Sequence, residues 1–98
     1  MSSAKVLIYG FGSAFDGRAD AASDVDLLVI HAATDAESCR FAMRCKHGLL
    51  EKIANADVTV LSEVEAREFH FIETSRASLI GSIRESHYGQ DISTILAP

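Results

Sequence analysis

The chain has 98 residues, of which 48% are hydrophobic and 23% are charged, as expected for one small globular domain. Its formal net charge of −5 argues against a protein that coats nucleic acid, because such proteins carry a basic patch. The sequence has no apolar run near the ~20 residues of a transmembrane helix and no secretory leader, so we expect a cytoplasmic protein without a membrane partner.

The first two thirds of the chain predict three strands and one long helix. Residues 5–9 and 24–31 are apolar runs of strand length, and residues 57–61 form a third. Residues 10–23 are rich in glycine, alanine and short polar residues, which leaves room for a turn and about one helical turn. Residues 35–54 carry apolar side chains at helical spacing and predict a helix.

This predicted helix should turn one apolar stripe toward the sheet. The stripe comprises Cys39, Ala42, Met43, Leu49, Leu50 and Ile53. Cys39 and Cys45 lie six positions apart, so they point to different faces of the helix. They form no C-x-x-C motif, and we expect neither a disulfide nor a metal site from them.

The last third of the chain predicts two helices and a loose tail. Ser62-Glu63-Val64-Glu65 fits the capping box, in which each of the two end side chains bonds to the other residue's backbone N–H, and it predicts a helix through about Phe69. Residues 75–85 carry apolar side chains at helical spacing and predict a second helix. Residues 87–89 are predicted to be briefly extended, and residues 90–98 to be loose.

The order of these elements (β, turn, β, α, β, α, α) predicts an α/β (α+β) domain, with a small mixed sheet flanked by helices. We assign residues 1–90 to this domain and residues 91–98 to a flexible C-terminal tail. No internal repeat or low-complexity segment divides the chain.

The glycines after the first strand predict an anion-binding turn, because glycine lets the backbone approach a phosphate without a Cβ in the way. Gly10-x-Gly12 resembles the start of a dinucleotide-binding fingerprint, but only five residues separate Gly17 from Ser23, where the next strand begins. A dinucleotide fold needs a whole helix in that interval. A P-loop is excluded because no Gly-Lys-Ser/Thr follows the glycines.

Two aspartates in the second predicted strand indicate a metal. Asp24 and Asp26 are two positions apart, so they project from the same face. Two like charges there are costly, and Mg²⁺, which binds one or two carboxylates, would offset that cost. Asp57 opens the third strand and is placed to join them, as two-metal phosphoryl or nucleotidyl transfer requires. Taken singly, Asp24 reads as a residue that caps a strand end, and Asp57 as a residue of a helix-to-strand turn; it is their combination with the glycine turn that indicates a metal.

The combined pattern resembles the signature of the minimal nucleotidyltransferases of the DNA polymerase β superfamily. That pattern is Gly12-Ser13, three residues, Gly17, five residues, and then Ser23-Asp24-x-Asp26-Leu27. The likeness extends loosely to Asp57 and to residues 83–88, so it covers most of the chain. It implies a nucleotidyltransferase fold similar to the polymerase β palm.

The resemblance also implies a role for each matching residue. Gly12 and Ser13 would bind the phosphates of the nucleotide through backbone and hydroxyl groups. Asp24 and Asp26 would hold Mg²⁺, and Asp57 would be a third metal-binding carboxylate that activates the acceptor hydroxyl. The implied catalytic and metal-binding residues are thus Asp24, Asp26 and Asp57, and the implied nucleotide-binding residues are Gly12, Ser13, Gly17, Arg18 and Ser23.

Small stand-alone members of this family commonly accompany a helical HEPN-domain protein, often a ribonuclease toxin. They act as its antitoxin, in some cases by transferring AMP from ATP onto a tyrosine of the partner. The resemblance therefore implies an antitoxin that adenylylates a HEPN-domain toxin, with Mg²⁺ as cofactor, ATP as substrate and no direct contact with nucleic acid. Two alternatives are a catalytically weak antitoxin that occludes the toxin, and a subunit of a small-molecule nucleotidyltransferase.

The sequence departs from the family pattern at Ala14 and Asp16, positions that are commonly basic in the family. An anion beside a triphosphate site weakens nucleotide binding unless a cation compensates. Arg18 is the nearest cation in the sequence and is the expected substitute.

Overall fold

The computed structural model describes residues 4–12, 25–32 and 34–96. Within these residues the strands are β1 (Lys5–Phe11), β2 (Val25–His31), β3 (Ala56–Ser62) and β4 (Ser78–Arg84), which form one sheet in the order β3-β2-β1-β4. β1 runs antiparallel to β2 and to β4, whereas β2 and β3 are parallel. The sheet is therefore mixed, as predicted.

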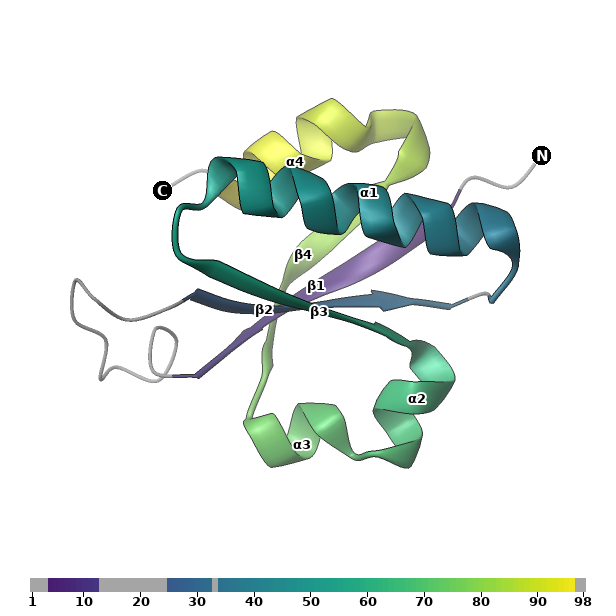
Figure 1. Cartoon of the computed structure of the whole chain (residues 1–98), viewed down its shortest axis with the longest axis vertical. Coiled ribbons are helices and arrows are strands. Elements are labelled where there is room, and N and C mark those ends of the chain that lie inside the picture. Colours follow the sequence, from purple (N-terminus) through teal and green to yellow (C-terminus); the bar gives the residue numbers. More distant parts are fainter. Residues whose placement is uncertain (1–3, 13–24, 33, 97–98) are drawn as a thin grey trace.

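Helices cover both faces of this sheet (Figure 1). α1 (Ala36–Lys52) and α4 (Tyr88–Leu96) lie on one face, and α2 (Glu63–Glu68) and α3 (Phe71–Ser75) lie on the other. A short 3-10 helix, η1 (Glu85–His87), connects β4 to α4. The predicted mixed α/β class is confirmed.

The two sheet faces bury two cores of different size. The larger core lies under α1 and α4, and its buried members are Val6, Ile8, Leu27, Val29, Phe41, Ala42, Cys45, Leu49, Val58, Ile83 and Ile92. The smaller core lies under α2 and α3, and its buried members are Leu28, Ile30 and Ala66. Successive residues of β2 enter opposite cores, which explains why residues 27–30 form an unbroken apolar run.

The predicted start of α2 is confirmed in atomic detail. The Ser62 hydroxyl accepts a hydrogen bond from the Glu65 N–H at 3.1 Å, and the Glu65 carboxylate accepts one from the Ser62 N–H at 2.9 Å. This reciprocal pair is the capping box.

The predicted helix over residues 75–85 is wrong, because most of this segment is β4. Ile83 pairs with Val6 and Leu79 pairs with Tyr9 of β1. A local pattern of apolar residues did not distinguish the two outcomes, because the decisive contacts come from a strand about 70 residues earlier.

The predicted extended piece at 87–89 and the predicted loose segment at 90–98 are also wrong as far as Leu96. His87 ends η1, and the residues from Tyr88 to Leu96 form α4, whose Ile92 is buried in the larger core. A single well-buried isoleucine and packing against β4 are enough to order a short helix.

The apolar stripe predicted for α1 is rotated relative to the observed one. The buried residues of α1 are Phe41, Ala42, Cys45, Gly48 and Leu49. Met43 and Leu50, which the pattern assigned to the stripe, are 41% and 39% exposed. Gly48 is buried under Tyr88, whose hydroxyl occupies the space that a Cβ at position 48 would need.

Candidate functional site

Two of the predicted site residues lie side by side on adjacent strands. In the parallel β2–β3 pair, Asp26 is the register partner of Asp57. Neighbouring strands are about 4.8 Å apart. Alternation along β2 places Asp26 on the same face as Leu28 and Ile30, which is the face covered by α2 and α3. Alternation along β3 places Asp57 on that face with Leu61.

The two carboxylates differ in their surroundings. Asp26 is half-buried at the start of β2, and Asp57 is exposed at the start of β3. The Asp57 carboxylate is therefore the one of the two that solvent and an incoming molecule can reach more easily.

Gly12 lies directly against the Asp26 carboxylate. Its φ of 82° is in the left-handed region that favours glycine, and a Cβ at this position would collide with the Asp26 Oδ2. Phe11, the residue before it, is the register partner of Asp26. The end of β1 therefore brings a glycine with left-handed backbone against the Asp26 carboxylate.

The remaining predicted site residues lie outside the described residues. They are Ser13, Gly17, Arg18, Ser23 and Asp24, and the positions of Ala14 and Asp16 lie outside as well. In the described part of the chain, no group of three or more His, Cys, Asp or Glu side chains is arranged to hold a metal ion. Asp26 and Asp57 are two carboxylates, the number that commonly binds Mg²⁺ in proteins.

An aromatic pair borders this site and was not predicted from the sequence. The rings of Phe11 and Phe71 meet edge to face, with centroids 5.4 Å apart. Phe71 is the first residue of α3. The residues on either side of this helix, His70 and Arg76, both have positive φ. The left-handed residue at each end turns the chain sharply, which seats α3 on the same sheet face as Asp26. Phe69, by contrast, is 65% exposed.

Comparison with known proteins does not assign this chain to a family. No family model, curated protein or solved structure matches the chain. In the segments that the structure describes, no helix is long and apolar enough to cross a membrane. The function is therefore inferred from the residues at this edge of the sheet.

Proposed function

We propose that this protein is a cytoplasmic nucleotidyltransferase that transfers AMP from ATP onto a HEPN-domain toxin and acts as its antitoxin. The supporting observation is the pairing of Asp26 with Asp57, with the Gly12 backbone packed against the Asp26 carboxylate. Strand-borne carboxylates beside a glycine turn suit a nucleoside triphosphate bound with Mg²⁺.

Each described site residue has a distinct task in this proposal. Gly12 lets the end of β1 approach the Asp26 carboxylate closely, and Asp26 and Asp57, with Asp24, would hold Mg²⁺. When bound, the metal neutralises phosphate charge and lowers the pKa of the attacking hydroxyl. Asp57, exposed on β3, takes the proton from the acceptor hydroxyl. The hydroxyl oxygen then forms a bond to the α-phosphorus of ATP, and pyrophosphate leaves.

Electrostatics make this site dependent on the metal. Asp26 and Asp57 would repel a triphosphate in the absence of a cation, and the chain as a whole carries a formal charge of −5. We therefore expect ATP to bind with Mg²⁺ and to bind far more weakly in EDTA. Isothermal titration calorimetry under the two conditions measures this difference.

The decisive experiment measures the mass of a partner protein. The purified protein is incubated with the HEPN-domain product of a neighbouring gene, ATP and Mg²⁺, and the partner is analysed by intact-mass spectrometry. We expect the mass of the partner to increase by one AMP. The rate of this transfer should fall at least about 100-fold in Asp26→Asn and in Asp57→Asn, because each variant removes a charge that would bind the metal. Glu68→Gln, which removes an exposed carboxylate on α2, is the matched control and should retain the activity.

The outcome separates transfer from simple occlusion. If the partner gains no mass while both asparagine variants still neutralise the toxin, the transferase proposal is wrong and occlusion explains the antitoxin activity. If AMP is transferred to a small molecule and not to the partner, the protein acceptor is wrong while the chemistry stands.

A further inference from the structure

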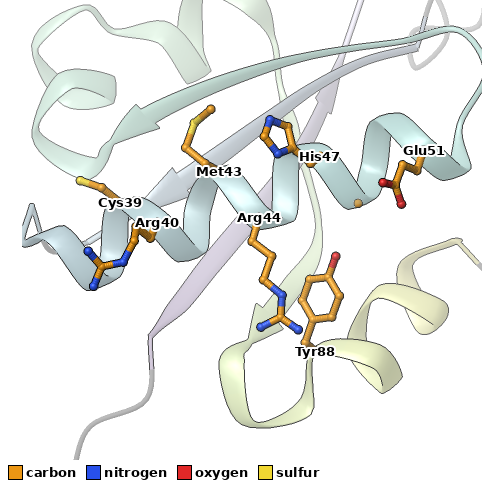
Figure 2. Close-up of a pocket in the computed structure, with 8 residues that line it drawn as sticks. Cys39, Arg40, Met43, Arg44, His47, Glu51 and Tyr88 are labelled. Atoms are coloured by element: carbon orange, nitrogen blue, oxygen red, sulfur yellow. The ribbon is translucent and has the colours of Figure 1, made fainter.

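The outer side of α1 carries a shallow groove on the sheet face opposite to the carboxylate pair. Its volume is about 600 Å³. The lining residues are Cys39, Arg40, Met43, Arg44, His47, Gly48, Glu51 and Tyr88, and Figure 2 shows them along α1 with Tyr88 approaching from α4. From Cys39 to Glu51 the groove follows α1 for about 18 Å at the helical rise of ~1.5 Å per residue.

Tyr88 forms one wall of this groove and is held in place from two sides. Its ring meets that of Phe41 edge to face, with centroids 6.3 Å apart, and the guanidinium carbon of Arg44 lies 4.2 Å from its centroid. Its hydroxyl packs against Gly48, where a Cβ would collide with it. The wall is therefore preformed, which lowers the entropy cost of binding.

Positive charge is concentrated along α1. This helix carries Arg40, Arg44, Lys46 and Lys52 against two glutamates, in a chain whose formal net charge is −5. Elsewhere in the described residues, Arg67 pairs with Glu63 and Arg84 pairs with Asp91. No such ion pair joins Arg40 or Arg44 to a described carboxylate.

Apolar surface lies across α1 from these charges. Met43 is 41% exposed and lines the same groove, and Figure 2 shows it on the side of α1 opposite to Arg44. Arg40 and Arg44 extend from one side of α1, a single turn apart (Figure 2). Two carboxylates one turn apart on a second helix have the same spacing, and planar guanidinium groups bind carboxylates through two parallel hydrogen bonds.

We propose that this groove binds an acidic amphipathic helix of a protein partner, with two carboxylates on Arg40 and Arg44 and separate apolar side chains against Met43 and against Tyr88. A polyanion such as RNA is disfavoured because it offers no aliphatic side chain to cover Met43, which is 41% exposed. The proposal does not depend on nucleotide transfer, because the groove and the carboxylate pair lie on opposite faces of the sheet.

The test uses three fluorescein-labelled helical peptides of equal length. The first carries two glutamates four positions apart with two leucines on the same face, and its twins carry glutamine or lysine in place of glutamate. We expect saturable anisotropy changes with the glutamate peptide, and affinity about tenfold lower for the glutamine twin. In NMR spectra of the ¹⁵N-labelled full chain, the shifted amides should cluster in residues 39–51 and at Tyr88.

Charge reversal provides the sharper test. Arg40→Glu/Arg44→Glu should lose the glutamate peptide and gain affinity for the lysine twin, and that gain requires a folded protein. Lys5→Glu/Arg76→Glu makes the same charge change at exposed positions away from α1 and should bind the glutamate peptide as the wild type does.

Three results would overturn the proposal. The first is no saturable binding of the glutamate peptide at millimolar concentration. The second is tighter binding of a single-stranded RNA of similar length, which would make the groove a nucleic-acid site. The third is self-association in sedimentation experiments that Arg40→Glu/Arg44→Glu abolishes, because a second copy of the chain would then occupy the groove.

Discussion

At the scale of single residues, two glycines lie where a Cβ would meet a neighbouring side chain. Gly12 has a φ of 82° and contacts the Asp26 carboxylate, and Gly48 contacts the Tyr88 hydroxyl. Gly89, by contrast, lies in α4 with nothing within 4 Å of where its Cβ would be. Glycine is therefore favoured at position 12 by both backbone and space, at position 48 by space alone, and at position 89 by neither.

Substitution of Gly12 by alanine should destabilise the protein. The left-handed backbone and the collision with Asp26 together should lower the free energy of unfolding by about 2 kcal/mol or more, whereas Gly89→Ala should be neutral or stabilise α4 by about 0.5 kcal/mol. Urea denaturation followed by circular dichroism measures both. Equal stability of Gly12→Ala and the wild type would contradict the close approach of Gly12 to Asp26.

At the scale of elements, one ion pair joins the end of β4 to α4. The Asp91 carboxylate accepts hydrogen bonds from the Arg84 backbone N–H at 2.9 Å and from the Arg84 guanidinium at 2.9 and 3.0 Å. The side-chain hydrogen bond from Arg84 is the main cause that lowers the pKa of Asp91 from 3.8 to about 2. This contact closes the turn through η1 and sets where α4 packs on the sheet.

The stability of the protein should depend on this pair at acid pH. Because the pKa of Asp91 is lower in the folded chain than its ordinary value of 3.8, its contribution is complete above that value and is lost as the pH falls toward about 2. Asp91→Asn should have a lower melting temperature than the wild type near neutral pH. This difference in melting temperature should shrink as the pH falls from 3.8 toward about 2. Differential scanning calorimetry across the acid range measures it, with Glu68→Gln as control. A difference that does not change with pH would contradict the pair.

At the scale of the whole molecule, α1 and the sheet seal Cys45 inside the larger core. Burial raises the pKa of its thiol to about 12. Cys39, six residues earlier, is only half-buried at the rim of the α1 groove. The sequence-based inference that the two thiols point to different faces is consistent with these positions.

The two thiols should therefore report on different events. A thiol reagent should modify Cys39 at once in the native protein, and Cys45 only as fast as the core opens, because its thiolate is suppressed by burial. A Cys39→Ser variant isolates the slow reaction, whose rate should rise with urea in step with global unfolding. Rapid labelling of Cys45 in water would contradict a sealed core.

Much of the fold was predictable wherever neighbouring residues dictate local structure. The apolar runs of β1, β2 and β3 and the helical spacing of α1 were sufficient to locate those elements. The Ser62–Glu65 pair located the start of α2, because a capping box is made by residues three positions apart. β4 and α4 were not predictable, because Ile83 and Ile92 are ordered by a core drawn from distant segments.

The candidate site divides in the same way. The sequence by itself determined which residues have the chemistry: a glycine turn, and aspartates at the starts of two strands. Only the tertiary structure decided that β3 lies parallel to β2 with Asp57 beside Asp26, that Phe71 meets Phe11, and that Tyr88 walls the α1 groove. Strand register and helix docking depend on the total apolar surface buried by the whole chain, and a local pattern carries no information about that sum.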